Sequence, residues 1–146
     1  MACTRATPPD VLPPLPPGAT PLHYAGEGST SLNLCLADAA QSLRPAYRHF
    51  GAASPGQARL PVTATWGAVI AHYDRALAGW HVVRRPAEQG ASTSCLLREW
   101  VTGRWFWEQR FAVVLVDRTG HYGGPYRDEA GPLKALYIVV PSPDRS

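Results

Sequence analysis

The chain lacks most of the features that assign a protein to a functional class at once. Charged residues make up only 17% of its 146 residues, and lysine is nearly absent, since thirteen of the fourteen basic residues are arginine. No apolar run approaches the roughly 20 residues that span a bilayer, so the sequence predicts no transmembrane segment. The net charge is +3, but the arginines are scattered and form no basic run of the nucleic-acid-binding type.

Catalytic and metal-binding motifs are absent as well. The three cysteines have no C-x-x-C spacing, neither H-E-x-x-H nor G-x-S-x-G occurs, and the five histidines are spread singly. The sequence therefore predicts no cofactor and no metal site, and it favours a protein that is not an enzyme. A small hydrolase that uses His121 and Asp128 is the enzymatic alternative.

What is present suffices for one globular domain. Hydrophobic residues make up 45% of the chain, which suits a single core. Residues 1–21 hold seven of the fifteen prolines and few residues able to fill a core, so we expect a flexible leash of polyproline II type. A proline-rich ligand for the aromatic groove of another protein is the alternative for this segment. Residues 22–146 are expected to form a single α+β domain.

One helix is indicated between Thr65 and Gly79. Thr65 can cap its N-terminus, and Gly79 supplies the left-handed residue that ends it. Five apolar residues fall on one stripe at helical spacing: Trp66, Val69, Ile70, Tyr73 and Leu77. We expect this stripe to be buried against Val113 and Leu115 or their neighbours.

The remaining segments predict mainly strands. We expect strands at about 30–36, 80–83, 95–101, 104–116 and 133–140, an imperfect helix from Asp38 to about Phe50, and a surface loop over residues 51–59. Residues 111–116 are apolar on both faces, which indicates a central strand. The predicted fold is α+β, with an antiparallel sheet of four to five strands and one or two helices packed on one face.

Tryptophans and arginines gather where the two longest strands are expected to meet. Four aromatic residues, Trp100, Trp105, Phe106 and Trp107, are flanked by Arg98, Arg104 and Arg110. If the hairpin turns at Thr102-Gly103, Trp105 and Trp107 point to the same side at a period of two. Such a pair beside Arg104 could stack bases or bind an aromatic or glycan ligand. The alternative is that the tryptophans fill the core, with arginine stems covering the edge.

The loop over residues 117–131 is the second candidate binding segment. It combines glycines with His121, Tyr122 and Tyr126, and mixtures of tyrosine and glycine make adaptable binding surfaces. Its acids could hold a hard cation, but their spacing matches no calcium loop. A plain hairpin loop is the alternative. We expect Tyr122 or Tyr126 to lie beside Trp105 or Trp107.

The start of the chain suggests a lipid anchor. Ala2-Cys3 followed by a proline-rich segment is how a mature bacterial lipoprotein begins, although no apolar stretch precedes the junction here. Cys3 is then a candidate for lipidation. Cys35 and Cys95 could form one disulfide in an oxidising compartment, and the alternative is a cytoplasmic protein with buried thiols.

A family resemblance points the same way. The segment Leu15-Pro16-Pro17-Gly18-Ala19-Thr20, the pattern Tyr73-x-x-x-Leu77-x-Gly79-Trp80 and the later strands resemble small bacterial envelope lipoprotein-type domains. The chain departs from them in a long insertion between Gly51 and Leu60 and in a helix one residue shorter. The resemblance implies an extracytoplasmic, non-enzymatic domain and no particular site.

These features predict a non-enzymatic binding or interaction module, tethered to the cell envelope. Its expected partner is a protein or a small molecule, bound by the 117–131 loop together with part of the tryptophan hairpin. The alternative is a small nucleic-acid-binding protein that uses tryptophan and arginine on the hairpin.

Overall fold

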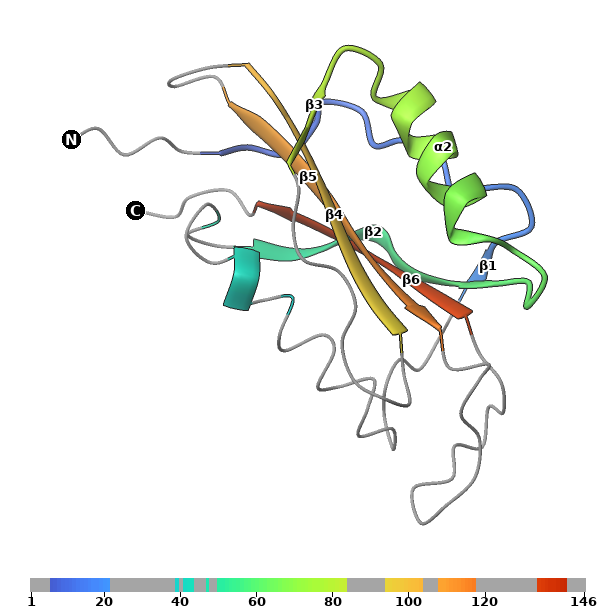
Figure 1. The fold of residues 1–146 in the computed structure, drawn as a ribbon. Helices are drawn as coiled ribbons and strands as arrows, with labels where there is room; N and C mark the ends of the chain where they lie inside the picture. The colour runs from blue at the N-terminus through green and yellow to red at the C-terminus, as the bar shows by residue number, and fades with distance from the viewer. Residues whose placement is uncertain are drawn as a thin grey trace.

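The computed structural model describes residues 6–21, 39, 41–43, 47, 50–83, 94–103, 108–117 and 134–141 (Figure 1). Its elements are β1 (Thr20–Pro21), β2 (Phe50–Leu60), α2 (Trp66–Ala76), β3 (His81–Val83), β4 (Ser94–Thr102), β5 (Gln109–Asp117) and β6 (Lys134–Pro141). The strands form one antiparallel sheet in the order β1-β2-β6-β5-β4-β3. The predicted α+β class, dominated by its sheet, is confirmed.

Strand β5 lies inside the sheet, between β6 and β4, and its apolar side chains pack on both faces. Phe111, Val113 and Leu115 join one buried cluster, while Ala112 and Val114 join the cluster on the opposite face. Residues on both faces of β5 are buried from Phe111 to Val116, which confirms the predicted central strand.

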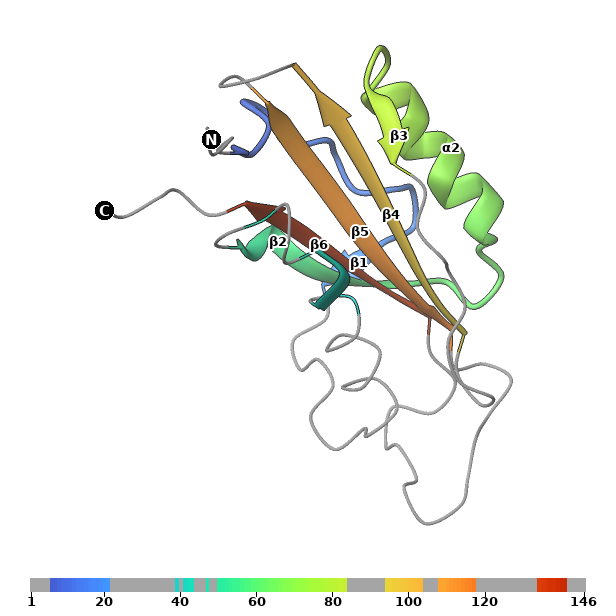
Figure 2. The ribbon, with the colours of Figure 1, turned by 60° about the vertical axis from the view of Figure 1, so that its left-hand side comes forward.

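Helix α2 covers one face of the sheet, as Figures 1 and 2 show. The Thr65 side chain accepts a hydrogen bond from the Ala68 amide at 3.2 Å, which confirms the predicted cap. Gly79 adopts a φ of 89° just beyond the helix. The predicted stripe faces the core: Val69, Tyr73 and Leu77 are buried in the cluster that contains Val113 and Leu115, with Trp66 and Ile70 half-buried against it.

The opposite face is covered by residues from the segment predicted as an imperfect helix. Ala39 and residues 41–43 are helical, and Ala39, Leu43 and Tyr47 are buried with Val114, Val116 and Tyr137. The sheet therefore has helical cover on both faces, whereas the sequence predicted helices on one face only. The strand expected at about 30–36 lies outside the described residues.

The surface loop predicted over residues 51–59 is wrong, because β2 runs through this segment and pairs with β6. The register shifts between Ala52 and Gln57, so the stretch around Pro55 and Gly56 forms a β-bulge or similar irregularity. A bulge leaves a residue out of the ladder, so it tolerates a proline that cannot donate a hydrogen bond. Pro55 and Gly56 thus indicate an interruption within a strand, and not a loop in place of the strand.

Residues 6–21 pack against the domain instead of forming a free leash. Thr7 makes a parallel bridge to Gln109, and Thr20 and Pro21 pair with Arg59 and Ala58. Between these points Leu12, Leu15 and Ala19 pack against the cluster under α2. In Figure 1 this blue segment runs past α2 to reach β1. The packed domain therefore begins before residue 22, the predicted boundary.

Candidate functional site

The predicted binding residues lie outside the described part of the chain. This holds for Arg104, Trp105, Trp107, His121, Tyr122 and Tyr126. It holds also for Cys3 and Cys35, and for Cys95 only the backbone is described. The expected contacts of these side chains, the disulfide and the lipid anchor therefore stay predictions.

The ends of the two candidate segments are nevertheless fixed by the sheet. Strands β4 and β5 form a hairpin whose last pair is Thr102↔Gln109, followed by Gly103 at a φ of 81°. β4 thus ends where the turn was predicted, but Thr102 is still paired with Gln109, so the connection runs over residues 103–108 rather than turning at Thr102-Gly103. However, β5 begins at Gln109 rather than at Arg104. Trp105 and Trp107 lie outside the described residues, so their expected alternation stays a prediction. We call this end of the β4–β5 hairpin, which includes Gly103 and Glu108, the hairpin end.

The 117–131 loop starts from the other end of β5. Asp117 pairs with Ser94 on β4 and with Lys134 on β6, so this loop end is bounded by three strand termini. Strand β5 has nine residues, and a rise of about 3.4 Å per residue separates its two ends by roughly 27 Å. The candidate segments therefore begin at opposite ends of the sheet, an arrangement that does not favour the single combined surface predicted above.

Ion pairs and hydrogen bonds stabilise the hairpin end. Arg110 donates to buried Glu99 at 2.8 Å and to Glu108 at 3.0 Å. Burial opposes the charge on Arg110, but hydrogen bonds to Glu108 and Glu99 outweigh it and raise the pKa of the guanidinium. The Thr7 amide also donates to the Glu108 carbonyl at 3.0 Å, and the Arg110 amide donates back to Thr7. The Glu108 side of the hairpin connection is thus held by Thr7, a partner distant in sequence.

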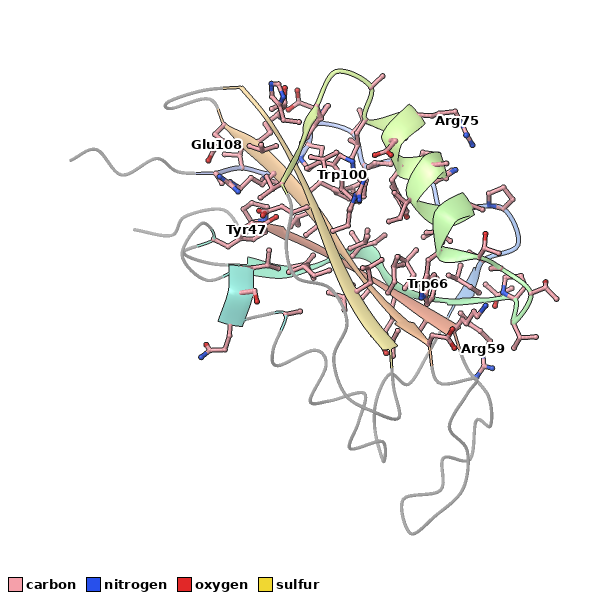
Figure 3. The ribbon with its side chains drawn as sticks, viewed as in Figure 1. Tyr47, Arg59, Trp66, Arg75, Trp100 and Glu108 are labelled. Carbon is pink, nitrogen blue, oxygen red and sulfur yellow. The ribbon has the colours of Figure 1, made fainter. Side chains whose placement is uncertain are left out.

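A second polar group joins helix α2 to β4. The Trp100 indole donates to the Asp74 carboxylate at 2.8 Å, and Arg98 lies 3.7 Å from the other oxygen of that carboxylate. The Arg98 guanidinium also lies 5.9 Å from the centre of a Trp100 ring. Trp100 is buried, so for this tryptophan the core-filling alternative is correct. Figure 3 shows its position between the sheet and α2.

Trp100 belongs to a three-ring cluster with Tyr73 and Phe111. Ring centres lie 5.5 Å apart for Tyr73 and Phe111 and 6.0 Å apart for Trp100 and Phe111, with tilted planes. The Tyr73 hydroxyl is buried and has no hydrogen-bond partner in the described part of the protein. Burial raises the pKa of Tyr73. The His72 ring meets Tyr73 edge-on at 5.0 Å, so this aromatic cluster continues toward the proline-rich segment.

Lys134, the single lysine of the sequence, links the start of β6 to the start of helix α2. Lys134 donates to the Ala64 carbonyl just before α2, and its ammonium lies 5.7 Å from the centre of a Trp66 ring. One side chain thus ties β6 to the start of the helix. Sequence reasoning did not single out Lys134, and only the pairing of β6 beside the helix brings it to Trp66.

The described residues contain no group of three or more histidine, cysteine or acidic side chains placed to hold a metal ion. None of the helices within the described ranges combines the length and hydropathy that would span a membrane. No family model, no curated protein and no solved structure matches this chain.

Proposed function

We propose that this chain is a non-enzymatic binding or interaction module whose contact surface is the hairpin end of the sheet. The observation that carries the proposal is the double anchoring of the connection from Gly103 to Glu108. It is closed by the Thr102↔Gln109 pair and fixed from the side by Thr7. Arg104, Trp105 and Trp107 belong to this short connection.

Rigid anchoring matters because binding is weakened by the entropy that is lost when flexible groups become ordered. Tryptophan offers a large contact area with only two side-chain torsions to fix. A short connection between two paired strand ends limits the backbone freedom that a partner must freeze. Tryptophans on such a connection supply contact area at a low entropic cost, which suits recognition of an apolar or aromatic surface.

Charge on the described residues favours a protein or small-molecule partner over nucleic acid. Two arginines of the β4–β5 hairpin already have carboxylate partners within the fold, since Arg98 lies beside Asp74 and Arg110 beside Glu99 and Glu108. Binding to phosphates requires cations that can exchange their counterions. These two side chains are engaged internally, so the nucleic-acid alternative requires other cations, Arg104 among them.

The test compares proteins retained from a cell lysate by the full chain and by a Trp105→Ala/Trp107→Ala variant. Val62→Ala is the matched control, because Val62 is a 56% exposed apolar residue beyond the opposite end of β2. We expect a set of proteins retained by the wild type and the control but lost with the double variant. Identical sets for all three would reject the hairpin end as the contact surface.

A labelled single-stranded oligonucleotide separates the two functions. Affinity that falls steeply with salt and disappears in Arg104→Ala would assign the hairpin end to nucleic acid. We expect no such binding from the wild type.

The envelope tether is proposed through Cys3. Only three peptide units separate Cys3 from Ala6, and they reach about 11 Å at most. Because the neighbouring Thr7 bonds to Glu108, a lipid on Cys3 would hold the hairpin end near the membrane surface. Membrane fractions of cells that express the natural gene should contain the wild type but not Cys3→Ser. Equal amounts of the wild type and of Cys3→Ser in the soluble fraction would contradict the tether.

A further inference from the structure

The second half of the N-terminal segment is held mainly by apolar packing. Residues 12–17 read Leu-Pro-Pro-Leu-Pro-Pro, and in each triplet the leucine is half-buried, the first proline is buried and the second proline is exposed. The leucines pack against the cluster under α2. The His72 ring adds a hydrogen bond from Nε2 to the Pro14 carbonyl at 2.7 Å. Detaching this half would expose apolar surface to water, which opposes its release.

The first half, residues 6–10, is held mainly by hydrogen bonds. The Thr7 amide donates to the Glu108 carbonyl at 3.0 Å, and the Thr7 carbonyl accepts from the Arg110 amide at 2.9 Å. The Thr7 hydroxyl lies 3.4 Å from the same Glu108 carbonyl oxygen. We call residues 6–10 the strap.

The other contacts of the strap also lie at or near the surface. The Gln109 side chain donates to the Pro8 carbonyl at 3.3 Å and to the Asp10 carboxylate at 3.4 Å. Pro9 is the one buried residue of the strap. Hydrogen bonds near the surface are replaced by bonds to water when they open, so the strap should detach at a lower free energy than the half that follows it.

The strap occupies an edge of β5 that β6 leaves open. The last pair between β5 and β6 at this end is Ala112↔Val139, and the two residues after Val139 pair with β2 instead. Thr7 continues the ladder beyond that point through its parallel bridge to Gln109. In Figure 2 the start of the blue segment lies beside the start of β5. The strap thus completes the sheet next to the hairpin end.

The two halves of the segment meet at Asp10 and Val11. The chain bends at both residues, and the Val11 side chain is 81% exposed, so little packing resists a rotation there. Leu12, the next residue, already belongs to the packing under α2. The strap can therefore detach by turning at Asp10 and Val11 while the following half stays in place.

We propose that the strap opens and closes on β5 as a unit and thereby regulates binding at the hairpin end. The closed strap fixes the Glu108 side of the connection that carries Trp105 and Trp107. The open strap frees that side, and a partner must then order it at an entropic cost. By linkage, a partner bound at the hairpin end favours the closed strap by the same factor. The regulated surface is that of the proposed function, on which this role of the strap rests.

Hydrogen exchange at the Arg110 amide tests the strap without any partner. Thr7→Pro removes the N–H that donates to Glu108, whereas Thr7→Ala keeps it at the same position. The Arg110 amide should exchange on the order of tenfold faster in Thr7→Pro than in the wild type, because its acceptor on residue 7 detaches more often. Exchange at Val114, which lies in the ladder between β4 and β6, should stay unchanged.

Thr7→Ala is the matched control. It loses only the 3.4 Å contact of the hydroxyl, so its Arg110 amide should exchange within about threefold of the wild-type rate. Equal Arg110 exchange in Thr7→Pro and Thr7→Ala would overturn the strap. Acceleration of the Val114 amide together with that of Arg110 would also overturn it, because the sheet as a whole would then be opening.

Retention of proteins from a cell lysate tests the regulation. The probe is the set of proteins that the wild type retains and Trp105→Ala/Trp107→Ala loses. Half-maximal retention of this set should require at least about threefold more Thr7→Pro than Thr7→Ala protein, since the open strap leaves the hairpin end to be ordered on binding. Equal retention would overturn the regulation and leave the hairpin end as the contact surface. The absence of any such set would reject the proposed function and the regulation with it, whatever the exchange at Arg110 shows.

Discussion

Tyr73 and Glu99 both place polar oxygen atoms in the interior of the domain, but only Glu99 is shown beside a partner of opposite charge. Arg110 lies 2.8 Å from Glu99 on one face of the sheet, whereas the Tyr73 hydroxyl is buried under α2 with no partner in the described part of the chain. A buried donor left unsatisfied costs about 1–3 kcal/mol. Removing the Tyr73 hydroxyl and removing the Arg110 cation should therefore have opposite effects on the stability of the domain.

Tyr73→Phe should leave the domain as stable as the wild type or more stable by about 1 kcal/mol, because it removes an unsatisfied hydroxyl and keeps the ring contacts. Tyr73→Ala, which removes the ring, should cost about 3–5 kcal/mol. Urea denaturation measures both values. A loss of more than about 1 kcal/mol in Tyr73→Phe would show that the hydroxyl has a partner.

The pH dependence of Tyr73 has a definite sign. Burial raises its pKa in the folded state, so between the ordinary value of 10.0 and the folded value the unfolded chain loses a proton that the folded chain keeps. Stability should therefore fall as pH rises above about 10, by up to about 1.4 kcal/mol per pH unit from this residue. Urea midpoints from pH 9 to pH 11 should decline less steeply in Tyr73→Phe; parallel declines would contradict the shift.

Arg110→Met should destabilise the domain by about 3–5 kcal/mol, because it removes the cation that lies 2.8 Å from the buried Glu99 carboxylate. Glu108→Gln is the matched control: it weakens the other bond to the same guanidinium at a more exposed position and should cost less than about 1 kcal/mol. Thermal unfolding of the two variants compares them. Equal losses would show that burial of Glu99 does not govern the network.

At the scale of elements, α2 could be predicted from the sequence because its signals are local. Its cap at Thr65, its apolar stripe and its stop at Gly79 all occur within one short stretch. β2 was missed for the opposite reason: Pro55 and Gly56 are turn residues locally, and only pairing with the distant β6 shows that they interrupt a strand. The packing of residues 12–17, which read Leu-Pro-Pro-Leu-Pro-Pro, had a local signal in its period of three. That signal was not used, because a proline-rich segment is also typical of a flexible tether.

Gly67 within α2 and Gly79 just after it provide a matched test of where the helix ends. Gly79 has a φ of 89°, so Gly79→Ala should destabilise the domain by about 1–2 kcal/mol although no atom lies near the added methyl. Gly67 lies within the helix with equally open space, so Gly67→Ala should stabilise by about 0.4–1 kcal/mol. Thermal midpoints that shift in the same direction for both variants would contradict this assignment of the helix end.

At the scale of the molecule, sheet topology decides which candidate segments can act together. Sequence spacing suggested one surface from the tryptophan hairpin and the 117–131 loop, but β5 separates their starting points by its full length. This separation depends on the pairing of β4 and β6 with β5, which no local pattern encodes. Conversely, residues 6–21 and α2, distant in sequence, share one face and one core cluster.

The central claim is that the Leu-Pro-Pro segment is an integral part of the α2 face, held there by His72. The most direct measurement is a nuclear Overhauser spectrum of the wild-type protein. It should show cross-peaks between the His72 ring protons and the protons of Pro14 and Leu15, because the His72 nitrogen lies 2.7 Å from the Pro14 carbonyl oxygen. Absent cross-peaks, with random-coil shifts for residues 8–19, would contradict the claim and restore the segment to a free leash.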